Sequence, residues 1–234
     1  MEETYNLTAI ILNRRPFSEN DGRVAVYSGE RGKLELTVRG LKKIKSKLAG
    51  HLEPITLASI MAVRGRQYDY VGAAVSEDCY FNIKSDLDKL AAAGEAIRIF
   101  NKIIKTGQAD AEIFELLKNF FNVLENNAKG AYNFLCRLFI FKLLVKLGHK
   151  PELHHCVKCQ AKVTPAGLKF DLARGGLICD NCRTKSGLTI SENSVKLLRL
   201  AEKNDFKKII KIKINKKTEG EAENIISSFL DYHF

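Results

Sequence analysis

The sequence predicts an α+β protein of 234 residues, in which a small N-terminal β-barrel precedes an α-helical domain with an inserted four-cysteine ribbon. Three observations predict this fold class. Runs that alternate polar and apolar residues fill about the first 75 positions, runs with helical periodicity follow, and two C-x2-C pairs interrupt the helical part. We expect the barrel domain at residues 1–80 and the helical domain at 81–234, with the ribbon at about 152–186.

Five β-strands account for the N-terminal part. They are predicted at residues 7–12, 23–27, 33–38, 55–63 and 68–75. The third strand is the clearest, because Leu34, Leu36 and Val38 fall on one face. Turn residues at 28–32 join the second and third strands in a hairpin. The strands suit a five-stranded barrel of the OB type, although an SH3-like barrel has similar strand statistics.

Helical periodicity begins near Ser85, which we expect to cap the first helix with its hydroxyl. The apolar positions predicted to face the core in this helix are Leu87, Leu90, Ala91, Ile97, Phe100 and Ile104. Further helices are expected at residues 111–124, 131–147, 191–203 and 221–232. The helix at 131–147 is apolar on most faces and is expected at the centre of the domain. Residues 206–214 alternate enough to predict a short extended segment.

The strongest chemical signal is the pair of C-x2-C motifs, separated by a 19-residue spacer that reads as a hairpin. Their four thiolates, from Cys156, Cys159, Cys179 and Cys182, match a closed tetrahedral Zn²⁺ site. Because all four ligands come from the protein, no position remains for water, and the metal is expected to be structural. Disulfide bonds are the alternative, which a cytosolic location disfavours.

Other cysteines and histidines are given different roles. Cys79 and Cys136 lie in strand or helix patterns and are expected in the core. His154 and His155 adjoin the first C-x2-C motif, where they are either alternative ligands or solvated loop residues.

The charge is strongly and locally basic. The chain has 38 Lys and Arg against 27 Asp and Glu, a net charge of +11. Residues 31–47 carry seven basic residues and one acid, and residues 196–217 carry nine basic residues and two acids. This pattern predicts a polyanionic partner, either nucleic acid or an anionic membrane surface. No apolar run approaches the roughly 18 residues of a membrane span, and the acidic N-terminus lacks the features of a secretion signal. We therefore expect a cytosolic protein that does not enter the membrane.

Seven basic residues of the predicted barrel are candidates for phosphate contact. They are Arg14 and Arg15, at the end of the first strand, and Arg39, Lys42, Lys43, Lys45 and Lys47, after the third. Phe17, Tyr68 and Tyr70 are expected either to stack on bases or to pack against a neighbour, with the two tyrosines on one face of the fifth strand. The lysines at 207, 208, 211, 213, 216 and 217 suit a second nucleic-acid face or a solvated sheet edge equally well.

The order of motifs resembles the bacterial DNA repair protein RecO family. The N-terminal part of the resemblance lies in Glu19-Asn20-Asp21, Gly32-Lys33-Leu34, the basic run at 38–47 and Leu52-Glu53-Pro54. The C-terminal part lies in Leu147-Gly148-His149-Lys150-Pro151, the two C-x2-C motifs and Gly175-Gly176. The family usually continues beyond its final helix into a short basic tail with serines, whereas this sequence ends at His233-Phe234.

The resemblance implies an N-terminal OB fold, a helical domain and an inserted zinc ribbon. It also implies binding to single- and double-stranded DNA, annealing of complementary strands without ATP, and assistance to recombinase loading at gaps. The implied partners are RecR and the single-stranded-DNA-binding protein, and the implied location is cytoplasmic and nucleoid-associated.

Enzymatic motifs are missing from the sequence. It contains no P-loop, dinucleotide-binding glycine motif, HExxH or nucleophile elbow, and the basic regions lack the clustered acids that hold a nuclease metal. We therefore expect a protein that is not an enzyme. The alternative function is a basic, zinc-containing RNA-binding or ribosome-associated factor.

Overall fold

The computed structural model describes residues 3–127, 130–164, 167–182 and 187–234. The chain forms two compact units, residues 1–130 and 131–234. The domain limits expected from the sequence, 1–80 and 81–234, separate strands from helices and stay a prediction. No helix among the described residues is long and apolar enough to cross a membrane.

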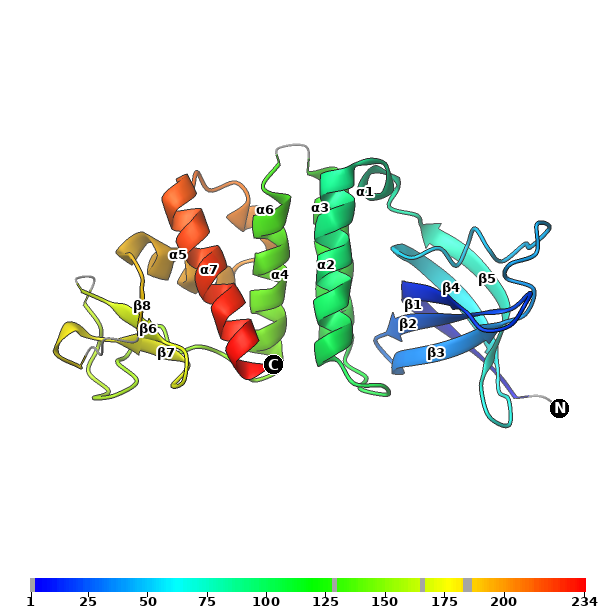
Figure 1. The fold of residues 1–234 in the computed structure, drawn as a ribbon, viewed down its shortest axis with the longest axis horizontal. Helices are drawn as coiled ribbons and strands as arrows, with labels where there is room; N and C mark the ends of the chain where they lie inside the picture. The colour runs from blue at the N-terminus through cyan, green and yellow to red at the C-terminus, as the bar shows by residue number, and fades with distance from the viewer. Residues whose placement is uncertain (1–2, 128–129, 165–166, 183–186) are drawn as a thin grey trace. The chain divides into compact units, whose positions relative to one another are not determined.

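A closed five-stranded barrel begins the first unit (Figure 1). Its strands are β1 (Thr4–Pro16), β2 (Gly22–Ser28), β3 (Gly32–Val38), β4 (Thr56–Val63) and β5 (Tyr70–Asp78). Their order around the barrel is β1-β2-β3-β5-β4, and every pairing is antiparallel except that of β3 with β5. The predicted OB-type barrel is therefore confirmed, with each strand close to its expected position.

The length of β1 closes the barrel. Its first part pairs with β4 from Thr4 to Ile11, and its second part pairs with β2 from Ile10 to Pro16. The register shifts between Ile11 and Asn13, and a bulge of this kind bends a strand enough to serve two neighbours. Alternate residues point inward, so the core consists mainly of aliphatic side chains from Leu7, Ala9, Ile11, Val24, Val26, Leu36, Val38, Ala58, Ile60 and Ala62.

Three helices complete the first unit: α1 (Phe81–Ser85), α2 (Leu87–Ile103) and α3 (Ala111–Asn126). The predicted cap is wrong, because Ser85 is the last residue of α1 and Asp86 caps α2. The Asp86 carboxylate accepts hydrogen bonds from the backbone N–H groups of Asp88 (2.9 Å) and Lys89 (3.1 Å). An ionised carboxylate beside the helix N-terminus is also favoured by the helix dipole.

The buried face of α2 also differs from the expected one. Leu87 is 84% exposed, and Leu90 and Ala91 are also exposed. Ile97, Phe100 and Ile104 are buried as predicted, and the other buried positions are Ala92, Ala93, Ala96, Ile99 and Ile103, together with the stem of Lys89. Small alanines allow the start of α2 to pack closely, which a count of large apolar residues does not detect. On α3 the sequence predicts a buried stripe of Ile113, Phe114, Leu117, Phe120, Phe121 and Leu124, and all six residues are buried.

The second unit combines four helices with a small sheet. The helices are α4 (Tyr132–Lys146), α5 (Glu192–Lys203), α6 (Phe206–Ile209) and α7 (Lys216–His233). The strands are β6 (Lys169–Asp171), β7 (Gly176–Ile178) and β8 (Leu188–Thr189), in the order β7-β6-β8. Within this unit α4 packs against α5 and α7 (Figure 1). The β6–β7 hairpin agrees with the predicted spacer hairpin, whereas β8 was not predicted.

The extended segment predicted at 206–214 is wrong. Phe206 and Ile209 are both buried and three residues apart, so they match one helical turn, and the Asp205 carboxylate caps α6 by accepting from the Lys208 N–H (2.9 Å). The final helix also starts earlier than expected, because the Asn215 side chain accepts from the Thr218 N–H (2.7 Å) and caps α7.

The two isolated cysteines differ from each other. Cys136 on α4 is buried as expected. Cys79 is exposed, which contradicts the prediction, because β5 ends at Asp78 and Cys79 lies in the connection to α1.

We expect Asp86→Ala to destabilise α2 by about 1 kcal/mol, because two N–H groups of the first turn lose their acceptor. Hydrogen exchange of the α2 amides in the intact chain then becomes roughly fivefold faster. Ser85→Ala is the control, since the Ser85 hydroxyl donates to the Asn82 carbonyl within α1. Equal acceleration of α2 exchange by both substitutions contradicts the assignment of Asp86 as the cap.

Candidate nucleic-acid interface and metal centre

The barrel loop, defined as residues 39–47 after β3, has an anchored backbone. The Gly40 N–H donates to the Asp21 carboxylate (2.8 Å), and the Lys42 N–H donates to the Asn20 carbonyl (2.9 Å). Leu41 is buried between these two contacts and packs against Gly22, where a Cβ atom would lie only 2.4 Å from the Leu41 Cδ2 atom. The barrel loop is therefore attached to the β1–β2 connection at successive residues.

The basic side chains of the barrel loop, unlike its anchored backbone, are exposed to solvent. Its basic residues, Arg39, Lys42, Lys43, Lys45 and Lys47, are all exposed. Within the described part of the chain, none of the five forms an ion pair with a carboxylate. The Lys42 ammonium donates to the Ser18 carbonyl (3.2 Å), and the Arg39 guanidinium lies 4.5 Å from the centre of the Tyr70 ring. A fixed backbone with exposed, uncompensated cations is suited to a polyanion.

Arg14 and Arg15 have a different environment. Arg14 forms an ion pair with Glu53 (2.7 Å), and Arg15 forms one with Glu35 (2.6 Å). Arg14 therefore has its own carboxylate partner, whereas Arg15 shares Glu35 with Arg23 (3.2 Å). The assignment of these two residues to phosphate contact stays a prediction, and the uncompensated charge belongs to the barrel loop.

An aromatic stack that sequence reasoning missed joins two loops of the barrel. The Arg23 guanidinium lies 4.0 Å from the centre of the Phe17 ring and 3.9 Å from that of Tyr68. Its side chain is only 11% exposed and also contacts Glu35 (3.2 Å). Phe17 lies between β1 and β2, and Tyr68 lies between β4 and β5. Because Tyr68 precedes β5, the expectation that it shares a face of that strand with Tyr70 is wrong.

The connection that carries Tyr68 is anchored at its end. The Tyr5 hydroxyl donates to the Asp69 carboxylate (2.5 Å), and the Asp69 carbonyl accepts from the Thr37 N–H (2.9 Å). Burial and this carboxylate contact raise the pKa of Tyr5 to about 12, so the hydroxyl keeps its proton and remains a donor. Tyr68 therefore precedes an anchored residue, and Phe17 is held separately because its N–H donates to the Asp21 carbonyl (3.1 Å). The two side chains are 43% and 50% exposed.

The four predicted ligand cysteines meet at one point in the second unit. Their Sγ atoms all lie within 4.8 Å of one another, and the Cys159 and Cys179 sulfurs are 3.8 Å apart. A tetrahedron of thiolates around a metal at about 2.3 Å has sulfur–sulfur edges of about 3.8 Å. The separation is far longer than a disulfide bond of about 2.05 Å. The donor set and the spacing thus fit a metal ion.

Local backbone geometry builds each half of this cluster. Gln160 adopts a left-handed conformation (φ 61°), and its N–H donates back to the Cys156 carbonyl (2.8 Å). In the second half, the short 3-10 turn η1 (Asp180–Cys182) follows Cys179, and the Cys182 N–H donates to the Cys179 carbonyl (3.1 Å). The β6–β7 hairpin returns the chain so that the two turns face each other. The expected ribbon limit at 186 lies outside the described residues.

The thiols influence one another's ionisation. Burial raises the pKa of the Cys156 thiol. Hydrogen bonds from backbone N–H groups, first those of Cys179 and Cys159, have the larger opposite effect, so the pKa is lowered to about 6. At Cys182, a hydrogen bond with the Cys159 thiol, together with burial, raises the pKa to about 12. Four crowded sulfurs therefore resist full ionisation, and a divalent cation offsets that resistance.

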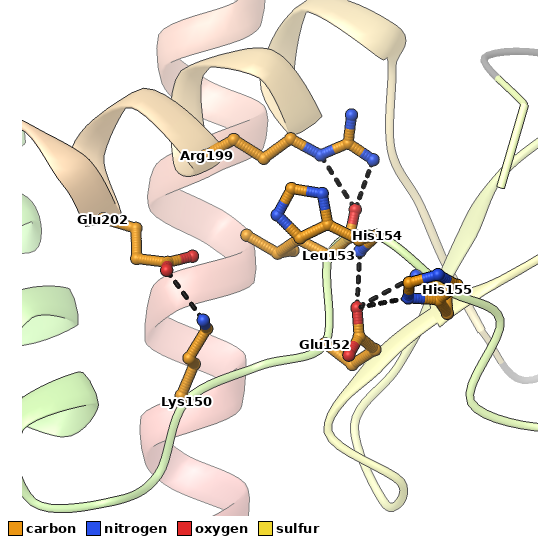
Figure 2. A network of polar contacts seen from close by, with 7 residues as sticks. All are labelled: Lys150, Glu152, Leu153, His154, His155, Arg199 and Glu202. Atoms are coloured by element: carbon orange, nitrogen blue, oxygen red, sulfur yellow. Dashed lines mark hydrogen bonds and ion pairs between the residues drawn. The ribbon is translucent and has the colours of Figure 1, made fainter. Parts of the chain in front are cut away.

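A polar network fixes the segment that leads into the first C-x2-C motif (Figure 2). Arg199 of α5 donates two hydrogen bonds to the Leu153 carbonyl, and Lys150 forms an ion pair with Glu202 of α5 (2.7 Å). Glu152 makes backbone hydrogen bonds in both directions with the chain at 175–177, each 2.9 Å long. These contacts hold the first C-x2-C motif against both α5 and β7.

The two histidines beside the cluster serve this network. The Glu152 carboxylate accepts from the backbone N–H groups of His154 (2.6 Å) and His155 (2.9 Å), as Figure 2 shows. Within the described residues, the group that offers metal ligands consists of the four cysteines without either histidine. Gly176 explains part of the Gly-Gly motif, because a Cβ atom there would lie 2.6 Å from the Glu152 carbonyl oxygen.

Comparisons with known proteins agree with this architecture. Residues 1–80 match the family model described as Recombination protein O N terminal, and residues 84–234 match that described as Recombination protein O C terminal. The fold and these matches define a protein of DNA repair and recombination. The chain belongs to the RecO family, which confirms the resemblance drawn from its motifs.

Relatives across bacteria cover nearly the whole chain. DNA repair protein RecO of Desulforamulus reducens is 29% identical over 231 residues, which are 98% of this chain and 89% of the relative. DNA repair protein RecO of a Dehalococcoides mccartyi strain is 31% identical over 221 residues, 94% of this chain and 86% of the relative. That of Alkaliphilus metalliredigens is 24% identical, covering 95% of this chain and 91% of the relative.

Proposed function

We propose that the chain binds single- and double-stranded DNA through the barrel loop and anneals complementary strands without ATP. The observation that carries this proposal is the set of five exposed, uncompensated cations on an anchored loop of an OB barrel. Phosphates are the natural ligands of such cations, and OB barrels bind oligonucleotides on their strand 2–3 face and adjoining loops. The exposed Phe17 and Tyr68 rings, fixed by Arg23, supply stacking surfaces beside them.

Annealing follows from how these groups hold a strand. Phosphate contacts neutralise the backbone and carry no base information, so the base edges stay available for pairing. Neutralised strands repel each other less, and duplex formation is itself favourable, so the step needs no nucleotide hydrolysis. The role proposed for the protein is to bind and present strands, without catalysing a covalent reaction.

We also propose a cellular location, a process and partners for this chain. Membership of the RecO family supports a function at gaps in chromosomal DNA, in the bacterial cytoplasm, where this chain assists recombinase loading. RecR and the single-stranded-DNA-binding protein are the proposed partners. Family membership also favours DNA over the alternative of a zinc-containing RNA-binding factor.

We further propose that the four-cysteine cluster holds one structural Zn²⁺ per chain. Four thiolates in a closed set suit Zn²⁺ and leave no open position for catalysis. The strands of the ribbon are only two or three residues long, so they contribute little cohesion of their own. The metal would join two distant parts of the chain and stabilise the ribbon directly.

For the metal, we expect purified protein to contain one zinc ion per chain by elemental mass spectrometry. Cys156→Ser with Cys159→Ser removes two ligands and should eliminate bound zinc and speed amide exchange in β6 and β7. His154→Ala is the matched control and should keep full zinc content. Stoichiometric zinc in the double cysteine variant contradicts the site.

For nucleic acid, each phosphate neutralised on a single strand contributes about 0.7 to the slope of log affinity against log salt. Changing Lys42, Lys43, Lys45 and Lys47 to alanine should therefore lower the slope for single-stranded DNA by roughly 2 to 3, equally for unrelated sequences. Fluorescence anisotropy across a salt series measures this.

The control for that series is Lys102→Ala with Lys105→Ala, which removes two exposed lysines elsewhere in the first unit and should leave the slope unchanged. A folded barrel-loop variant with the wild-type slope excludes this loop as the interface. Tighter binding of structured RNA than of single-stranded DNA at equal salt favours the RNA-binding alternative.

A further inference from the structure

A second basic surface lies in the other compact unit. The lysine segment, defined as residues 207–217, contains no acidic residue and six lysines: Lys207, Lys208, Lys211, Lys213, Lys216 and Lys217. All six are exposed. Within the described part of the chain, none of them forms an ion pair, in contrast to Lys150 and Lys196 nearby, which pair with Glu202 (2.7 Å) and Glu192 (2.5 Å).

Two short segments of the chain are dense in cations and contain no acid. Of the 38 lysines and arginines, five lie within the nine residues of the barrel loop and six within the eleven residues of the lysine segment. One segment lies in each compact unit. Runs of exposed like charge of this kind are suited to polyanions.

The fold excludes the explanation that these lysines protect the edge of a sheet. Lysines that protect a sheet edge must lie on a strand, but this segment consists of α6, a turn and the start of α7. The buried Phe206 and Ile209 attach α6 to the unit. Lys142 of α4 secures the preceding turn, because its ammonium donates to the carbonyls of Ala201 and Asn204, at 2.6 Å each. The backbone is therefore held while the lysines point to solvent.

The start of α7 adds to the attraction of the segment for anions. Lys216 and Lys217 lie in the first turn of this 18-residue helix, whose dipole favours anions, although Glu219 lies in the same turn and Lys217 interacts electrostatically with Glu221. Six lysines within eleven consecutive residues suit a partner that presents many charges, as nucleic acid does.

We propose that the lysine segment is a second phosphate-binding surface, which holds the second strand while the barrel loop holds the first. This inference rests on the proposed annealing function. A protein that brings two strands together needs two separate places to neutralise them, and the barrel loop and the lysine segment are two runs of exposed cations without an acid, one in each compact unit.

The experiment uses the full chain and oligothymidine strands, which cannot pair with each other. Protein is loaded with one molar equivalent of a donor-labelled strand, and transfer of fluorescence energy reports capture of a second strand that carries the acceptor. The test variant changes Lys211, Lys213, Lys216 and Lys217 to alanine. It should bind the first strand with wild-type affinity, capture the second about tenfold more weakly or worse, and lower the salt slope of capture by roughly 2 to 3.

Matched variants make the result decisive. The same four positions changed to arginine keep the charge and should retain capture, while the barrel-loop variant should lose affinity for the first strand. Unchanged zinc content and circular dichroism show that each variant is folded.

The remaining outcomes distinguish failure of the second surface from failure of the proposed function. Wild-type capture by the alanine variant, or loss of capture in the arginine variant, overturns the second surface while leaving the proposed function intact. Equal weakening of first-strand binding by the two alanine variants shows one continuous surface and also overturns the inference. Failure of the wild-type protein to bind any strand removes the proposed function itself.

Discussion

The double pairing of β1, with β2 along one half and with β4 along the other, is the constraint on which the N-terminal unit depends. It joins the two ends of the sheet into a closed barrel, in which β3 meets β5 at the pair Thr37 and Tyr70. Closure also brings together three connections that are distant in sequence. The β1–β2 connection contacts the barrel loop through Asp21 and Asn20, and it meets the β4–β5 connection through the stack around Arg23. The candidate interface is thus a consequence of barrel topology.

The clustered positive charge of the barrel loop destabilises the folded protein. Five like charges within nine residues of the barrel loop repel one another and disfavour the compact state. Other cations of the barrel are paired with carboxylates, as the contacts of Arg14 with Glu53 and of Arg15 with Glu35 show. A polyanionic ligand explains why the chain keeps such uncompensated clusters. When the cations bind nucleic acid, counterions are released, and this release makes the free energy of binding favourable.

Local patterns in the sequence were sufficient for much of the fold. The strands, the α3 stripe and the cysteine cluster all follow from spacings within one or two elements. The failures have a common cause. Residues 206–214 alternate like a strand, yet burial of Phe206 and Ile209 against the rest of the unit selects a helical turn. The Arg23 stack joins side chains from β2, the β1–β2 connection and the β4–β5 connection, so no local pattern in the sequence predicts it. The choice between Ser85 and Asp86 as cap depends on where α1 ends, which is also a tertiary matter.

The central claim is that single-stranded DNA binds through the uncompensated lysines of the barrel loop. Lysine acetylation followed by mass spectrometry tests this most directly, because it reports the protection of each ammonium in the unaltered chain. The account predicts that bound single-stranded DNA protects Lys42, Lys43, Lys45 and Lys47, while the exposed Lys102 and Lys105 keep their reactivity. Barrel-loop lysines that stay as reactive as Lys102 and Lys105 when DNA is bound contradict it.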